Sequence, residues 1–304
     1  MTGSTRAIVA ALAANAGIAV AKFVGFAITG SSAMLAEAVH SVADTSNQGL
    51  LLFGQRAARR AADSLHPFGY GRSRYFWSFV VAMVLFTLGA MFALYEGYHK
   101  ITHPVGLTSP QVAIAILTIA IGLEAFSFRT AIHESRPLKA DSSWWRFIRN
   151  SRSPELPVVL LEDAGALIGL LLALTGVSLS VLTGNPVWDG VATAAIGVLL
   201  GAIAVVLMVE MHSLLIGEGA TGAEEQAIRG ALEGTDHVER LIHLRTQYLG
   251  PDEMLVAAKI AFGAQVQLAT VAATIDAAEA RIRAAVPAAR IIYLEPDLDR
   301  AVAR

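Results

Sequence analysis

Apolar stretches alternate with short polar segments along the first two thirds of the chain. A helix needs about 20 mostly apolar residues to cross the hydrocarbon core of a bilayer, so this pattern predicts membrane-spanning helices. Six stretches have that length and character, at residues 7–29, 31–53, 75–98, 111–131, 156–174 (open to extension as far as Leu182) and 187–211. We therefore predict an all-α, six-helix membrane domain over residues 1–215.

The pattern changes after residue 215, where polar and apolar positions are mixed. Amphipathic helices are predicted at residues 223–233 and 268–285, and strands at residues 238–249, 254–262 and 290–294, the last closed by Pro296. Gly250 and Pro251 separate the first two strands as turn residues. The αββαβ order predicts a small α+β domain over residues 216–304, ferredoxin-like, with its helices on one face of a sheet.

The composition supports a membrane protein and excludes several other classes. Of 304 residues, 55% are hydrophobic and 16% are charged, whereas a soluble domain has about 25% charged residues. A net charge of −2 argues against nucleic-acid binding, and the absence of cysteine excludes disulfides and cysteine-based zinc sites. The first residues, MTGSTR, lack the features of a cleaved leader, so we expect the first helix to be an uncleaved span.

Arginine is concentrated in two of the segments between the predicted spans. These are the second–third and fourth–fifth segments, whereas the opposite segments carry only Lys100 as a basic residue. Because positively charged loops stay in the cytoplasm, we expect both termini and the C-terminal domain there. The Ala- and Arg-rich usage favours a bacterial inner membrane. Adjacent Trp144 and Trp145 among arginines predict a short helix at the membrane interface.

A polar stripe interrupts the second apolar stretch. Glu37, His40, Asp44 and Asn47 lie at i, i+3, i+7 and i+10, and therefore share one face of a helix. A carboxylate at the centre of a membrane helix costs at least about 2.5–3.5 kcal/mol. A helix that lines an ion pathway has a use for such side chains, whereas a helix that only packs does not.

Two further acids, Glu162 and Asp163, lie inside the fifth apolar stretch. The preceding residues LPVVLL place them beyond the first helical turn, which disfavours a role as caps of an interfacial helix. Imidazole and carboxylate groups are ligands of zinc-class ions, and His40 and Asp44 lie one turn apart on their helix. We interpret His40, Asp44, Glu162 and Asp163 as a candidate metal or proton site.

Two other charged residues have simpler expected roles. Lys22, in the first predicted span, is expected to extend its ammonium group to the membrane surface, with pairing to an acid as the alternative. Asp189 follows Pro186 at the start of the sixth span, where we expect it to stabilise the positive end of that helix.

Several motifs together resemble the cation diffusion facilitator family of divalent metal transporters. They are AEAVHSVADTSNQ in the second span, DSLHPFGYGR after it, PELPVVLLEDAGALIG in the fifth span, LLIGEGA at the end of the sixth and IIYLEPD near the C-terminus. The fifth-span motif is similar to the branch that includes zinc transporter nine. The resemblance covers nearly the whole chain.

The resemblance implies proton-coupled export of divalent cations from the cytoplasm, usually Zn2+, by alternating access. It implies a secondary transporter rather than an enzyme, with no cofactor and no nucleic-acid partner. It also implies a homodimer assembled through the cytoplasmic domain. Tyr293 stands where some metal-binding relatives have His, which favours dimerisation over metal binding as the role of that domain.

The resemblance implies His40, Asp44 and Asp163 as transport ligands. The common zinc pattern has a His four residues before the helix-five acid, where this chain has Val159. Glu162, a water molecule or Asn47 are the alternatives for the missing ligand. An oxygen-rich set shifts the preference from Zn2+ toward Mn2+, and Fe2+ and Co2+ stay open. Glu37, Asp63 and His66 are candidate accessory or pathway residues, with Tyr70 where many relatives have another His.

Two functions outside transport are alternatives. A membrane metalloenzyme would need ligands with a general base, as in H-E-x-x-H, and the sequence lacks that motif. It also lacks a P-loop, so ATP is not the visible energy source. A metal-sensing scaffold that does not transport stays open, because Val159 replaces an expected ligand.

Overall fold

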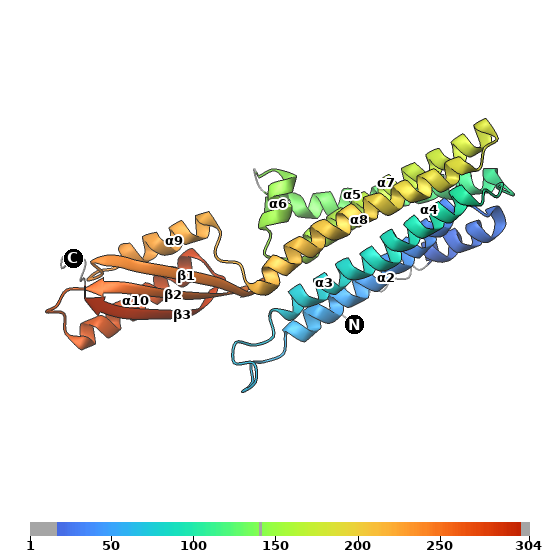
Figure 1. Cartoon of the computed structure of the whole chain (residues 1–304). Coiled ribbons are helices and arrows are strands. Elements are labelled where there is room, and N and C mark those ends of the chain that lie inside the picture. The colour runs from blue at the N-terminus through green and yellow to red at the C-terminus, as the bar shows by residue number, and fades with distance from the viewer. Residues whose placement is uncertain (1–16, 140–141, 299–304) are drawn as a thin grey trace. The chain divides into compact units, whose positions relative to one another are not determined.

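The computed structural model describes residues 17–139 and 142–298, which form helices followed by a small sheet (Figure 1). Contacts divide these residues into two compact units, 17–54 with 76–211 and 55–75 with 212–298. The segment 55–75 is thus grouped with the C-terminal residues, whereas we assigned it to the membrane domain. The boundary at residue 215 stays a prediction, and each unit is described by itself.

Long helices make up the first unit. The helix Gly17–Thr29 is the described part of the first predicted span, whose residues 7–16 lie outside the described residues. The others are α2 (Ser32–Ala58), α3 (Ser73–Val84), the π-helical η1 (Leu85–Met91), α4 (Phe92–Thr102), α5 (Pro110–Lys139), α7 (Glu155–Thr183) and α8 (Val187–Ile216). Figure 1 shows α3, η1 and α4 following one another as a single rod.

Four helices are long and apolar enough to cross a membrane by length and composition, among the described residues. They are Ser73–Thr102, Pro110–Arg136, Glu155–Thr183 and Val187–Ile216. These helices confirm the prediction of an integral membrane protein with several spans. α2 has 27 residues but carries the polar stripe, so the count of six spans stays a prediction.

Glycine lets α4 and α8 approach closely. A Cβ atom on Gly97 would lie 2.6 Å from the backbone nitrogen of Ala194, and one on Gly197 would lie 2.8 Å from the backbone nitrogen of Leu94. Such small residues are the usual means of bringing membrane helices together. Around this contact the bundle buries a continuous apolar core that includes Leu85 and Leu200.

A short helix, α6 (Trp144–Asn150), follows α5. Ser143 caps it by accepting a hydrogen bond from the backbone of Arg146. Phe147 and Ile148 are buried, and Arg149 Nε lies 3.2 Å from Glu210 Oε1 of α8. A helix therefore forms where the sequence predicted one, and its position at a membrane interface stays a prediction.

The C-terminal residues form an α+β unit, as predicted. Its elements are α9 (Gly222–Glu233), β1 (Arg240–Gly250), β2 (Glu253–Phe262), α10 (Leu268–Ala285) and β3 (Ala289–Leu298). The sheet order is β1-β2-β3, with β1 and β2 antiparallel and β2 and β3 parallel. The ferredoxin-like arrangement stays a prediction.

The last strand is longer than predicted. β3 runs through Pro296 to Leu298, with Pro296 in register with Ile260 of β2. Proline lacks a backbone donor, but an edge strand tolerates it because one side of the strand needs no ladder bonds. Lys259 of β2 also holds this end of β3, with Nζ 2.9 Å from Glu295 Oε1 and 3.0 Å from Asp297 Oδ2.

The segment 55–75 contacts the β1–β2 turn within the second unit. Arg74 Nη1 lies 2.9 Å from Asp252 Oδ2. A Cβ atom on Gly71 would lie 2.7 Å from the carbonyl oxygen of Leu249, so the two backbones are in direct contact there. These contacts explain why this segment groups with the sheet rather than with the helices.

Candidate metal centre in the helical bundle

The polar stripe of α2 points into the bundle. Glu37 and Asn47 are fully buried and His40 is 1% exposed, while the Asp44 side chain keeps 20% of its surface. The prediction that these four residues share one face of the helix is confirmed, and that face points to the interior of the bundle.

Residues on this face and on the neighbouring helices make three polar contacts. His40 Nε2 lies 3.4 Å from Asp44 Oδ2. The Asn47 amide donates a 2.6 Å hydrogen bond to Glu162 Oε1 of α7. Ser127 Oγ of α5 donates a 3.0 Å hydrogen bond to Asp163 Oδ2. Residues from α2, α5 and α7 therefore meet at one level of the bundle.

A small cavity of about 70 Å³ lies between these helices. Its polar lining consists of carboxylates, hydroxyls and one amide, from Ser41, Asp44, Gln48, Glu124, Ser127, Glu162 and Asp163. Val159 lines the same cavity, at the position where the family resemblance would place a His. The chemistry of the lining suits a cation held mainly by oxygen atoms.

Several buried polar atoms here lack a hydrogen-bond partner within the described part of the chain. They include both ring nitrogens of His40 and the second oxygens of Asp44 and Glu37. Leaving a buried polar group unsatisfied costs about 1–3 kcal/mol, so such atoms call for a physical explanation. A role as metal ligands would provide such an explanation.

The groups do not form a closed ligand cage. Within residues 17–139 and 142–298, no three His, Asp or Glu side chains are placed so that they could hold a metal ion together. Asp44, Glu162 and Asp163 share the cavity, whereas His40 is not part of its lining. Binding by all four would need side chains to turn away from Asn47 and Ser127.

Glu37 is engaged by a lysine. Lys22 Nζ lies 3.1 Å from Glu37 Oε2 and donates a 2.8 Å hydrogen bond to Ser41 Oγ. The Lys22 side chain is 2% exposed, so the expectation that its ammonium reaches the membrane surface is wrong. Pairing with an acid was the alternative for Lys22, and the ion pair with Glu37 confirms it. Spacing along one helix could not name the partner, because the contact depends on how the first helix packs against α2.

The accessory candidates Asp63 and His66 lie in the segment 55–75, which belongs to the second unit. Tyr70 donates a 2.6 Å hydrogen bond to Asp63 Oδ2, and His66 Nδ1 lies 3.5 Å from Asp63 Oδ1. The Tyr70 hydroxyl, followed by the backbone amide of His66, holds the pKa of the Asp63 carboxyl below its ordinary value. Tyr70 thus occupies one oxygen of the candidate ligand.

We expect Tyr70→Phe to raise the pKa of Asp63 toward its ordinary value of about 3.9. A carboxyl whose pKa is lowered by folding stabilises the protein at pH values above its ordinary pKa. This stabilisation is lost as the pH falls through the lower, folded-state pKa. The variant should therefore be less stable than wild type above about pH 4 and equal to it at lower pH. Carboxyl-carbon NMR titration of the labelled protein measures the shift, with Asp63→Asn assigning the signal. An unchanged pKa would contradict the hydrogen bond.

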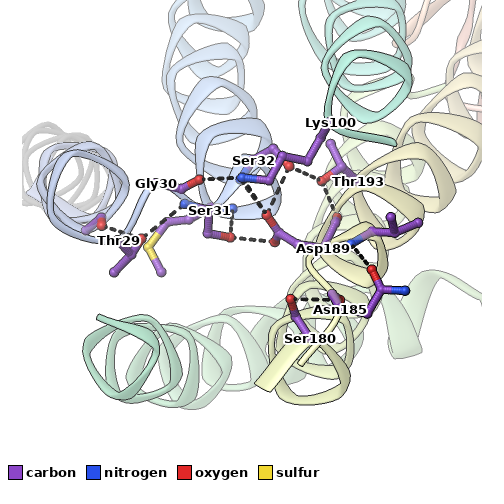
Figure 2. Close-up of polar contacts among 12 residues, drawn as sticks. Thr29, Gly30, Ser31, Ser32, Lys100, Ser180, Asn185, Asp189 and Thr193 are labelled. Carbon is purple, nitrogen blue, oxygen red and sulfur yellow. Dashed lines mark hydrogen bonds and ion pairs between the residues drawn. The ribbon is translucent and has the colours of Figure 1, made fainter. Parts of the chain in front are cut away.

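A second buried polar cluster lies at the N-terminus of α2 (Figure 2). Asp189 of α8 accepts hydrogen bonds from Ser31 Oγ at 2.7 Å, Ser32 N at 2.8 Å and Ser32 Oγ at 3.1 Å. Lys100 Nζ lies 3.8 Å from Asp189 Oδ2 and donates a 3.0 Å hydrogen bond to Gly30 O. Asp189 therefore caps α2, in addition to lying in the first turn of its own helix.

Comparisons with known proteins agree with these features. Residues 8–216 match the family model described as the cation efflux transmembrane domain. The chain is 31% identical over 268 residues to the Xenopus laevis protein named proton-coupled zinc antiporter SLC30A9, mitochondrial, covering 88% of this chain and 48% of that protein. It is 30% identical over 268 residues to metal tolerance protein C4 of Arabidopsis thaliana, covering 86% and 58%.

A magnetosome protein is a more distant relative. The chain is 26% identical over 234 residues to magnetosome protein MamB of Magnetospira sp. (strain QH-2), covering 74% of this chain and 72% of that protein. The chain spans about half the length of the curated zinc antiporters that it matches.

Proposed function

Because the chain belongs to the cation diffusion facilitator family, near the branch of the zinc antiporter SLC30A9, we propose that it exports divalent metal cations from the cytoplasm, with Zn2+ as the leading substrate, in exchange for protons. Members of this family are transporters and not enzymes. The observation that carries the proposal is the acidic cavity shared by α2, α5 and α7.

We assign the transport site to His40, Asp44, Asp163 and Glu162. Asp44, Glu162 and Asp163 line the cavity together, and His40 offers two ring nitrogens that have no hydrogen-bond partner within the described residues. One imidazole and several carboxylates are a donor set for zinc-class ions. Asn47 and Ser127 hold Glu162 and Asp163 in place by hydrogen bonds.

The same groups account for coupling to protons. Metal ligands bind in their deprotonated forms, so binding an ion releases protons and protonation releases the ion. Histidine is suited to this exchange because its ordinary pKa is about 6.5. Alternating access then lets the site load with metal from the cytoplasm and with protons from the other side.

The proposed topology follows from the arginine-rich segments. Six spans place both termini and the α+β unit in the cytoplasm, in a bacterial inner membrane. A homodimer assembled through the α+β unit is the proposed functional form.

Metal flux into proteoliposomes tests the function. Zn2+, Mn2+, Fe2+ and Co2+ are compared side by side under an imposed pH gradient. We expect Zn2+ flux that collapses when an ionophore dissipates the gradient. Gradient-independent flux would overturn proton coupling, and no flux of any ion would favour a metal-sensing scaffold.

Val159 supports a second candidate substrate. An apolar side chain lines the cavity where a His ligand would be expected, and carboxylates dominate the rest of the lining. Oxygen-rich sites favour harder ions, so Mn2+ or Fe2+ export is the alternative, with Co2+ as a further candidate. Faster flux of one of these ions in the same assay would identify it.

A further inference from the structure

We infer that Lys22 is a charge-balancing residue of the transport site, whose fixed positive charge offsets the negative charge of the acidic cavity and weakens metal binding enough for the ion to leave. The inference rests on the proposed function and extends it to a residue outside the ligand set. A buried ion pair beside the cavity is the observation behind it.

Lys22 is held next to the cavity wall. Its ammonium group donates to Ser41 Oγ at 2.8 Å and lies 3.1 Å from Glu37 Oε2. Ser41 directly follows His40 in α2 and lines the cavity with Asp44. The hydrogen bond to Ser41 therefore fixes the positive charge at the edge of the proposed ion site.

The described lining of the cavity carries acidic groups. Among the described lining residues, Asp44, Glu124, Glu162 and Asp163 are acidic, and none is Lys or Arg. Lys22 reaches this region through its hydrogen bond to Ser41, which lines the cavity. It thus supplies positive charge to a region that would otherwise be occupied by carboxylates alone.

A purely structural role explains the pair poorly. The attraction between two buried charges does little more than offset the cost of removing them from water. An apolar pair of similar volume often gives equal or greater stability. One oxygen of Glu37 also has no hydrogen-bond partner among the described residues. The arrangement therefore costs stability, which a function in ion binding would explain.

The charge model predicts opposite effects for the two partners. Lys22→Gln removes the positive charge while keeping a hydrogen-bond donor, so the metal should bind more tightly and leave more slowly. We expect KM to fall on the order of tenfold, with a lower maximal rate. Glu37→Gln leaves the Lys22 charge uncompensated, so KM should rise by a similar factor.

Two more variants separate charge from structure. Lys22→Arg keeps the charge and should keep the wild-type KM. The double variant Lys22→Gln/Glu37→Gln restores the charge balance, so its KM should return toward wild type. If Glu37 were instead a metal ligand, the double variant would keep the raised KM of Glu37→Gln, and this result would overturn the inference.

The experiment measures zinc flux into proteoliposomes and equilibrium zinc binding to the purified full chain, for wild type and the four variants at one pH. Opposite KM shifts with matching shifts in affinity support the inference. If the wild type transports zinc but KM is raised or unchanged in Lys22→Gln, the inference is overturned and the proposed function stands. If Lys22→Gln does not fold, a KM in Glu37→Gln that stays at the wild-type value overturns it. Absence of both flux and binding in wild type overturns the proposed function and the inference with it.

Discussion

Asp44→Asn is expected to lower zinc flux at least about 100-fold, because loss of a residue that only supports a metal ligand already costs about 10–100-fold. Asp44 lines the acidic cavity, and its second oxygen has no hydrogen-bond partner within the described part of the chain. Asparagine keeps the size of the side chain and removes its charge. Initial flux rates in proteoliposomes with equal amounts of protein measure the effect.

The control for this variant is Asp276→Asn, which changes the same functional group at an exposed position of α10. It should keep the wild-type flux. Size-exclusion chromatography of both variants checks that each protein stays folded. Wild-type flux in Asp44→Asn would overturn the assignment of α2 to the transport site, whatever ion is transported.

Periodicity made the polar face of α2 predictable. The spacing of Glu37, His40, Asp44 and Asn47 depends only on 3.6 residues per turn, so one helix suffices to bring them together. The burial of Glu37, His40 and Asn47 confirms that reasoning. The same local argument predicted α10 at residues 268–285, where the helix Leu268–Ala285 lies.

Contacts between helices were not predictable in the same way. Ser127 has no distinguishing pattern in α5, yet it holds Asp163. Lys22 pairs with a residue of the next helix, and nothing in the spacing along either helix fixes their relative rotation. The expected chemistry of each residue was therefore available from the sequence, whereas the choice of partner required the packed bundle.

For Asp189, the sequence predicted the role of the carboxylate in its own helix but not all of its hydrogen-bond partners. An acid in the first turn of a helix stabilises the positive end of that helix, and this is what the sequence predicted. The structure adds the start of α2, since Asp189 accepts a hydrogen bond from the backbone nitrogen of Ser32 (Figure 2). One carboxylate thereby fixes the N-terminus of the helix that carries His40 and Asp44.

Asp189→Ala is expected to destabilise the protein by about 3–5 kcal/mol, because it removes one partner of a buried charge pair. Lys100 and the donors of Ser31 and Ser32 would lose their shared acceptor in a region where Asp189 is fully buried. Thermal unfolding of the detergent-purified protein measures the loss.

The control is Thr193→Val, which removes hydrogen bonds to Ser32 and to the Asp189 backbone without removing a charge. It should cost only about 1–2 kcal/mol of stability. Adding Lys100→Met to Asp189→Ala should recover part of the loss, because no buried charge is then left alone. Equal stability of Asp189→Ala and wild type would mean that the cluster does not anchor α2.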